Sequence, residues 1–318
     1  MSGTLPKQLV KKLMKAWPSE PDPGNLTTWK IFQHESYLNS SLEEQNLIKL
    51  KSAQWRYEYE ADMPFFETYY PNFDVQQFSG QDVLDLGCFT CGRLVSWAEK
   101  YNFRLAAGID INPVFEDAGI LFAKKKGVPH DIRTGFGEAL PWENDRFDSV
   151  ISFDVFEHVK NVKAVMDECF RVLRPGGRLF ACFPSFYQPL EAHLGAVTKT
   201  PALHWFFSGA TITAAFDEIL AERGPSADWY GRSKTGLDEW EKLPTLNGIT
   251  VRKFRKILQE SEWEQEAWIR RPVLSDGRRS RKLLFRVLRA PLNIPARIPI
   301  MEELTLGRIC CILKKPSK

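Results

Sequence analysis

The stretch that decides the fold is Val83-Leu84-Asp85-Leu86-Gly87-Cys88-Phe89-Thr90-Cys91-Gly92-Arg93. A short apolar run leads into a turn between two glycines, and residues with helical spacing follow, which predicts a strand, a tight turn and a helix. Gly87 permits close approach of the backbone, and Gly92 begins the helix without a side chain in the way. Such a turn presents backbone N–H groups to a bound ligand.

Two classes of ligand compete for this turn. A dinucleotide site uses G-x-G-x-x-G, of which only the first and last glycines are present. Phe89 stands where a pyrophosphate requires bare backbone, and Asp85 adds a negative charge nearby. A ligand that carries an ammonium group and no phosphate suits Asp85 better. The methionine end of S-adenosylmethionine (SAM) is such a ligand.

Short apolar runs alternate with helical patterns through residues 81–183. The runs are Asp82–Leu86, Arg104–Asp110, His130–Thr134, Asp148–Phe153 and Arg178–Phe183. Helical spacing joins Leu94, Trp97, Ala98 and Tyr101 in one segment and Val162, Val165, Met166, Cys169 and Leu173 in another. This alternation predicts βαβ units, and therefore an α/β fold with a parallel sheet.

A second acid, Asp110, ends the second apolar run 25 residues after Asp85. A carboxylate at this place in a nucleotide-binding sheet accepts hydrogen bonds from both ribose hydroxyls. The alternative is a helix cap before Pro113. The spacing from the glycine turn favours the ribose contact.

These features resemble class I (Rossmann-like) SAM-dependent methyltransferases, especially the small-molecule group called methyltransferase type 11. Five motifs in order carry the resemblance: Asp85–Cys88, Asp110, Gly135–Trp142, Arg146–Ile151 and Leu173–Gly177. It implies a doubly wound, mostly parallel sheet of seven strands, with SAM as the cofactor. The residues that it implies for cofactor binding are Asp85, Gly87, Cys88, Phe89, Asp110, Ile111, Phe136, Gly137, Glu138 and Phe153.

Two residues depart from the family pattern. Cys91 replaces a glycine that is usual in the turn, but it is small, so we expect the turn to survive. Phe136 stands where the family commonly has an Asp that accepts a hydrogen bond from the adenine amino group. A non-catalytic SAM-binding protein is therefore an alternative.

Cys88-x-x-Cys91 lies inside the ligand turn without a second CxxC, so we interpret both cysteines as small turn residues rather than zinc ligands.

The segment after the fourth predicted strand places Asp154, Glu157 and His158 at i, i+3 and i+4, so a helical turn would cluster them. Three interpretations compete. A Glu-His-Val run is common here in the family whatever the substrate, which favours structural roles. His158 is alternatively the general base of a methyl transfer. In the third interpretation the cluster binds a metal, as in the E-x-x-E-H run of ubiquinone-pathway O-methyltransferases. Asp154 is one methylene shorter than that first glutamate, so we expect no metal.

Sequence texture divides the chain into four parts. Residues 1–80 are predicted to form a helical lid, 81–183 the SAM-binding core, 184–245 a substrate-side insertion after the fifth strand, and 246–318 a C-terminal completion of the sheet with a basic segment. Helical spacing within the first part joins Leu5, Leu9, Leu13 and Trp17.

Helix caps and a closing strand complete the predicted elements. Ser41, with Glu44 three residues on, predicts a helix start with a capping box. Asn247 is expected to cap a helix over Ile249–Ser261, and Leu306–Leu313 is expected to be the closing strand.

Aromatic and histidine side chains outside the core are the candidates for the substrate side. Tyr187, His193 and His204 lie in the insertion, where this fold usually places substrate-contacting elements, and with His158 they are the candidate catalytic residues. Packing of the insertion onto the sheet is the alternative. By analogy with related enzymes, Tyr57 or Tyr59 of the N-terminal part is expected to cover the cofactor.

The composition limits the classes of function. No window among the 318 residues has the pattern of a signal peptide or a spanning helix, so the expected compartment is the cytoplasm. The net charge of +3 hides a basic segment, residues 270–318, with 13 Lys or Arg against 3 Asp or Glu. Its partner is an anionic substrate, a nucleic acid or a membrane surface, unless it only completes the fold.

The basic segment carries a partly amphipathic pattern suited to weak contact with a membrane surface. Its basic residues are Arg278, Arg279, Arg281, Lys282, Arg286 and Arg289. No Asn/Asp-Pro-Pro-Tyr/Phe run follows the fourth strand and no RNA-binding module is present, so we expect no nucleic-acid partner.

The expected function is methyl transfer from SAM to an O or C atom of a small apolar or aromatic molecule. The alternatives are a metal-assisted O-methyltransferase of quinone or catechol type and a non-catalytic SAM-binding protein. The oligomeric state stays open.

Overall fold

One sheet of seven strands organises the residues that the computed structural model describes, which are 4–19, 31–32, 35–189, 194, 197–223, 246–275, 283–294 and 297–317. The strand order is β3-β2-β1-β4-β5-β7-β6. The strands are β1 (Asp82–Leu86), β2 (Leu105–Asp110), β3 (His130–Thr134), β4 (Phe147–Phe153), β5 (Leu173–Phe183), β6 (Glu264–Pro272) and β7 (Leu306–Lys314). Strands β1 to β5 pair in parallel, and β7 runs antiparallel to both of its neighbours. The mostly parallel seven-stranded sheet predicted from the sequence is therefore confirmed.

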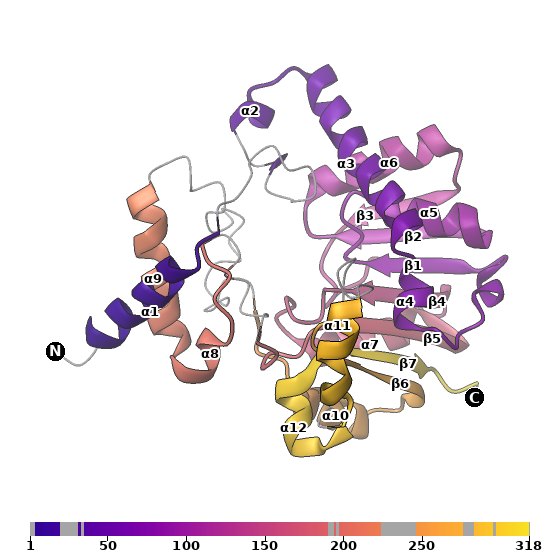
Figure 1. Ribbon diagram of the computed structural model, residues 1–318. Helices are drawn as coiled ribbons and strands as arrows, with labels where there is room; N and C mark the ends of the chain where they lie inside the picture. Colours follow the sequence, from indigo (N-terminus) through magenta and orange to yellow (C-terminus); the bar gives the residue numbers. More distant parts are fainter. Residues whose placement is uncertain are drawn as a thin grey trace.

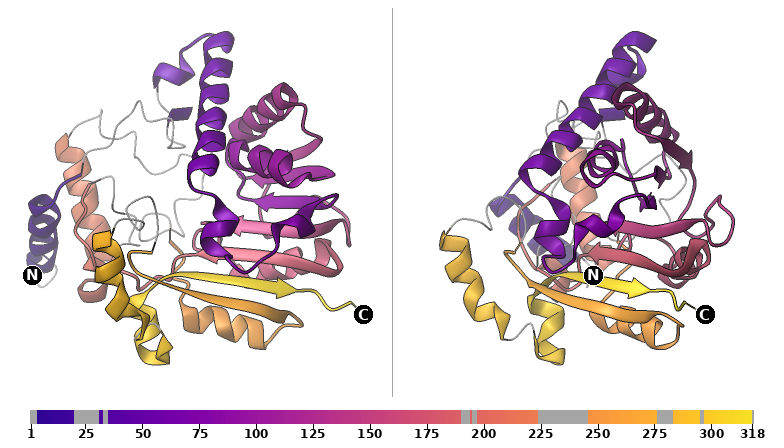
Figure 2. Two further views of the ribbon diagram at one scale, coloured as in Figure 1. Left: turned by 45° about the vertical axis from the view of Figure 1, so that its right-hand side comes forward. Right: turned by 90° about the vertical axis from the view of Figure 1, so that its right-hand side faces the viewer.

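Helices cover both faces of this sheet, as the views in Figures 1 and 2 show. One face packs against α3 (Leu42–Asp62), α4 (Phe65–Tyr69), α5 (Gly92–Tyr101) and α6 (Pro113–Lys126). The other packs against α7 (Val162–Val172) and α10 (Val251–Gln259). All five residues of β1 are buried, as expected of a central strand with both faces covered. The strand order reverses at β1 and β4, and ligands of such sheets bind beyond the carboxyl ends of the strands at that point.

The element boundaries show what the hydrophobic pattern detected and what it missed. Strands β1 and β3 have the predicted bounds, and β2, β4 and β7 differ from prediction by a residue. The sequence analysis did not predict strand β6. This strand lies at the edge of the sheet and pairs only with β7, and most of its residues are partly or fully exposed. Leu173, assigned by spacing to the preceding helix, instead begins β5.

The predicted helix caps had different outcomes. Helix α3 begins after Ser41, which forms the expected capping box with Glu44. Helix α10 begins after Thr250, whose side chain accepts from Lys253 N, so the cap predicted at Asn247 was wrong. The Asn247 side chain instead donates to two backbone carbonyls in the loop after β4. A short polar side chain before a helix can either cap that helix or form hydrogen bonds with a distant loop. The sequence pattern is the same in both cases, and tertiary packing decides which contact forms.

Helix α1 (Thr4–Ala16) pairs with α9 (Gly209–Arg223) on the side of the molecule where the parallel strands end (Figure 1). Val10 and Met14 are buried in this contact, and Lys11 pairs with Glu218 and Glu222 of α9. The helix is where the sequence places it, but its regular apolar stripe faces outward. Leu5, Leu9, Leu13 and Trp17 are the exposed residues of that stripe. Within the described part of the chain, no helix is both long enough and apolar enough to cross a bilayer.

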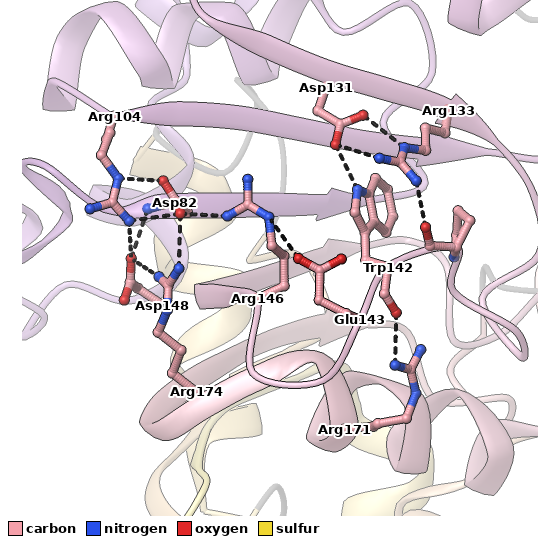
Figure 3. A network of polar contacts seen from close by, with 11 residues as sticks. Asp82, Arg104, Asp131, Arg133, Trp142, Glu143, Arg146, Asp148, Arg171 and Arg174 are labelled. Atoms are coloured by element: carbon pink, nitrogen blue, oxygen red, sulfur yellow. Dashed lines mark hydrogen bonds and ion pairs between the residues drawn. The ribbon is translucent and has the colours of Figure 1, made fainter.

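A charged cluster lies at the opposite end of the parallel strands, where β1 begins. Asp82 is buried and accepts hydrogen bonds from Arg104, Arg146 and Arg174, as Figure 3 shows. Burial alone would raise the pKa of the Asp82 carboxyl, but the hydrogen bonds from the three guanidinium groups hold it well below its usual range. Arg174 also pairs with Asp148, so the cluster ties β1, β4 and the start of β5 together.

Candidate SAM site

The glycine turn after β1 has the shape that the sequence requires. Gly87 has φ +77°, and a Cβ at this position would collide with the side chain of Val155. A Cβ at Gly92 would collide with the backbone carbonyl of Ala53 in α3. Gly87 and Gly92 are therefore required because two other segments approach the turn closely.

Two non-glycine residues of the turn adopt the left-handed region. Phe89 has φ 51°, and Cys91, which replaces the usual glycine, has φ 58° and precedes α5. The turn thus keeps its shape at a strain cost of about 1–2 kcal/mol for such a residue. Cys91 is buried where a Cβ on Gly119 of α6 would meet its sulfur, so packing offsets part of that cost. The Cys88 side chain is buried beside it.

Two carboxylates lie at the carboxyl ends of neighbouring strands: Asp85 is the buried penultimate residue of β1, and Asp110 is the half-buried last residue of β2. Among the described residues, no group donates a hydrogen bond to Asp85 or forms an ion pair with it, and burial raises the pKa of its carboxyl to about 7. Asp110 accepts from Phe89 N at 3.0 Å and from Asn112 N at 3.4 Å. Burial raises the pKa of Asp110 to about 6, although these backbone hydrogen bonds lower it. A buried acid without a cation suits a cationic ligand, so the pair fits the ammonium and ribose of SAM.

Apolar side chains lie beside these acids. Ile111 follows β2 and Phe136 follows β3, and each is 50% exposed. Gly137 is confined between Leu86 and Val165, where a Cβ would be tight. Glu138 accepts from the backbone N–H groups of Lys160 and Asn161, next to the start of α7. Ile111 and Phe136 thus remain available to an adenine ring, whereas Glu138 already holds backbone in place.

The segment after β4 is a turn rather than the expected helical cluster. Asp154 has φ 58° and its carboxylate pairs with Arg308 of β7. Glu157 is buried, and its Oε1 lies 3.6 Å from Nε2 of His158. Asn247 donates to Phe156 O and Val159 O in this turn, at 2.7 Å each. The backbone of residues 154–160 is not helical, and Asn247 ties it to a distant part of the chain.

One of the three candidate metal ligands in this turn has another partner. In the residues that the structure places, no three His, Cys, Asp or Glu side chains gather in a group that could hold an ion. Asp154, the first position of the run that resembles E-x-x-E-H, is instead engaged by a guanidinium group.

The candidates in the insertion lie in different surroundings. Tyr187 is 40% exposed, and Trp205 Nε1 donates to its backbone carbonyl at 2.7 Å. His204 lies in α8 (Leu203–Phe206), is 8% exposed and packs edge-on against Phe186 at 5.3 Å between ring centroids. Burial lowers the pKa of His204. His193 lies outside the described residues.

A cavity of about 300 Å³ adjoins the end of β4 and contains residues that the sequence analysis did not select. Tyr59 of α3 lines it, whereas Tyr57 turns away to pack against Phe122 of α6. Three arginines also line it: Arg56, Arg93 and Arg308. Arg93 directly follows the glycine turn, which was a usable signal, but nothing in the sequence pattern near Arg308 pointed to the site.

The fold, the glycine turn and the acids ending β1 and β2 define a Rossmann-like domain suited to SAM. Residues 84–181 match the family model described as a methyltransferase domain, and this part of the chain is similar to SAM-dependent methyltransferases. S-adenosylmethionine is the cofactor of this class.

Curated relatives match part of the chain. A ubiquinone biosynthesis O-methyltransferase of Rhizobium etli is 37% identical over 103 residues, which are 32% of this chain and 40% of that protein. The enzyme of the same name from Cereibacter sphaeroides is 30% identical over 132 residues, 42% of this chain and 52% of that one. The chain thus spans about half the length of these relatives. A putative sarcosine dimethylglycine methyltransferase from Galdieria sulphuraria aligns over 90% of both chains at 16% identity, with a TM-score of 0.47.

Proposed function

We propose that the chain is a SAM-dependent methyltransferase that methylates an oxygen, or alternatively a carbon, of a small apolar or aromatic molecule. The observation that carries the proposal is the buried carboxylate of Asp85, which has no hydrogen-bond or ion-pair partner among the described residues and lies beside the glycine turn. The match of residues 84–181 to a methyltransferase domain supports it. The O-methyltransferase relatives favour oxygen as the acceptor atom.

The chain's own residues bind and orient in this proposal. Asp85 holds the ammonium group, Asp110 the ribose hydroxyls, and the exposed side chains of Ile111 and Phe136 flank the adenine. Bound SAM supplies a methyl group on a positively charged sulfur, already activated for in-line displacement, so positioning provides much of the rate.

His158 is the proposed general base for a hydroxyl acceptor. Its imidazole ring takes the proton that the hydroxyl loses, and its Nε2 lies 3.6 Å from Oε1 of the buried Glu157. The turn carrying His158 is held by Asn247, which limits its motion. A His158→Ala variant is expected to lose turnover by about 10²–10⁴-fold, with SAM affinity retained. Retained turnover would leave Glu157 and His158 with the structural role.

The four-part division of the chain is also part of the proposal. Residues 1–80 and 184–245 close the acceptor side over the core at 81–183, and 246–318 complete the sheet. The described parts of the first and third segments support this, because α1 and α9 pack together at the carboxyl end of the parallel strands (Figure 1).

Weak contact with an anionic membrane is the proposed role of the basic C-terminal segment. Helix α11 (Leu283–Arg289) exposes four apolar side chains together with Arg286, as an interfacial helix would. The four apolar side chains are Leu283, Leu284, Val287 and Leu288. Co-sedimentation with phosphatidylglycerol vesicles, but not with phosphatidylcholine vesicles, is expected. Loss of this binding in Leu284→Glu would support the assignment, and equal binding by that variant would refute it.

The buried, unbridged state of all six cysteines fits a cytoplasmic location.

Calorimetric titration with SAM tests the core of the proposal. Asp110→Asn should weaken SAM binding about 10–100-fold, as loss of a charged hydrogen-bond partner would. The matched control is Asp167→Asn, which changes an exposed acid on α7 that pairs with Lys163. Unchanged affinity in Asp110→Asn would place the cofactor elsewhere. SAM binding without methyl transfer to any phenol, catechol or carbon acid tested would favour the non-catalytic alternative.

A further inference from the structure

The cavity at the end of β4 has an excess of positive charge that the proposed SAM contacts do not use. Its ionised lining residues are three arginines and one acid, Asp154. Arg308 pairs with Asp154, and Arg93 Nε lies 3.4 Å from Oε2 of the buried Glu60. Arg56, from α3, adds a further cation to the same wall. The lining itself therefore carries two more positive than negative charges.

Arg56 is held in a position that favours an anion. Its guanidinium carbon lies 5.1 Å from the ring centre of Phe89 and 5.2 Å from that of Trp55. Burial and the nearby charge of Arg93 lower its pKa to about 10. An anion in the cavity would relieve both the desolvation and the repulsion between the two guanidinium groups.

The rest of the wall is aromatic. It consists of Trp55, Tyr59, Phe65, Tyr69 and Phe153, with Met63. The guanidinium carbons of Arg93 and Arg308 lie over the Phe153 ring, 4.6 Å and 4.9 Å from its centre, so this ring limits the positions that both groups can take. Fixed, planar guanidinium groups bind carboxylates through paired N–H donors better than an ammonium would.

We propose that this cavity is a carboxylate-binding subsite in which Arg56 and Arg93 hold the carboxylate between aromatic walls. The inference rests on the proposed function only for the source of the carboxylate. One source is the amino-acid end of SAM, since Arg93 interacts electrostatically with both Arg56 and the ammonium-binding Asp85. The other is an acidic aromatic acceptor, which the walls would fit.

Calorimetry with paired ligands tests the subsite in the full chain. S-adenosylhomocysteine is compared with its decarboxylated analogue, which keeps the ammonium group. Benzoate is compared with benzamide in protein saturated with either nucleoside. On the wild type we expect one carboxylate of these pairs to bind at least about tenfold more tightly than its neutral partner. A difference in the first pair assigns the cofactor as the source, and a difference in the second assigns the acceptor.

Variants then assign the effect to the arginine. Arg56→Gln should abolish the preference for the carboxylate, and Arg56→Lys should restore part of it, since it keeps the charge but loses the fork. The control is Arg178→Gln, which changes an arginine paired with Glu266 on the sheet surface. If the wild type shows no preference in either pair, the subsite is refuted whether or not the variants fold. Failure of both nucleosides to bind would refute the SAM site instead, and the benzoate comparison on the free protein would still decide the subsite.

Discussion

Both terminal guanidinium nitrogens of Arg308, in β7, donate hydrogen bonds to the carboxylate of Asp154, the residue that follows β4. The pair joins two strands separated by β5 in the sheet order, and it occupies the carboxylate that the metal-binding interpretation required. A carboxylate held by a guanidinium fork is a poor ligand, because the cation would have to displace a charged partner.

Methyl transfer and SAM binding should therefore be insensitive to chelators. Turnover measured in millimolar EDTA is expected to equal turnover in added magnesium. The opposite finding, activity lost in EDTA and recovered with magnesium or zinc, would mean that Arg308 releases Asp154 in the working enzyme.

The binding of SAM should depend on pH through Asp85. Burial raises the pKa of this carboxyl to about 7, Arg93 lowers it, and Asp110 and Glu60 raise it. Only the ionised form attracts the ammonium group, so affinity should fall as the pH drops through about 7, by up to about tenfold per unit at lower pH. In Asp85→Asn the affinity should be low at pH 8 and nearly independent of pH. A wild-type affinity that does not change between pH 5 and 8 would contradict this role.

The same carboxyl should leave a signature in the stability of the ligand-free protein. Its pKa is higher in the folded state than the usual value of about 4, so the folded state binds the proton more tightly. Its contribution is therefore fully present below about pH 4 and is lost as the pH rises to about 7. Compared with the wild type, Asp85→Asn should be relatively more stable at pH 8 than at pH 4 by thermal unfolding. No change in the difference between the two proteins would argue against a buried, unpaired acid.

Asp82 should matter for stability and not for the ligand. Asp82→Asn leaves Arg104, Arg146 and Arg174 without their shared buried carboxylate. Breaking a buried ion cluster costs about 3–5 kcal/mol, and the lower end applies because the arginines reach solvent. We expect a fall in Tm of roughly 6 °C or more, with SAM affinity unchanged below the transition, since Asp82 lies at the opposite end of β1 from Asp85.

Glu143→Gln is the matched control for that variant, because Glu143 is an exposed partner of Arg146. It should change stability by less than about 1 kcal/mol. Equal effects of the two substitutions would show that burial of Asp82 contributes nothing.

Tyr187 and His204 should respond differently to removal, although both were selected as candidates from the insertion. Tyr187→Ala removes an exposed ring and is expected to raise the acceptor KM with SAM affinity retained. His204→Ala removes a buried ring packed on Phe186 and should mainly lower Tm. Wild-type turnover and KM in Tyr187→Ala would remove this residue from the acceptor site, and a stable His204→Ala with raised KM would place His204 in it.

The core was predictable because its signals are local. Strands β1 and β3 have the bounds expected from their apolar runs, and the glycine turn follows from Gly87 and Gly92. The edge strand β6 escaped detection because its mostly exposed, charged residues leave only a weak apolar alternation. Asn247 was assigned to a cap because a short polar residue before a helical pattern is compatible with one, and its contacts 88 and 91 residues away in the chain have no local signature.

The sequence by itself determined the class of fold, the shape of the glycine turn, and the acids near the carboxyl ends of β1 and β2, because each depends on residues adjacent in the chain. Only the tertiary structure decided which tyrosine of α3 faces the cavity, that the apolar stripe of α1 faces outward, and that Arg56, Arg93 and Arg308 meet. The physical reason is that spacing along a helix specifies a shared face but not the direction of that face. The partner against which the helix packs sets that direction, and here the partners come from distant parts of the chain.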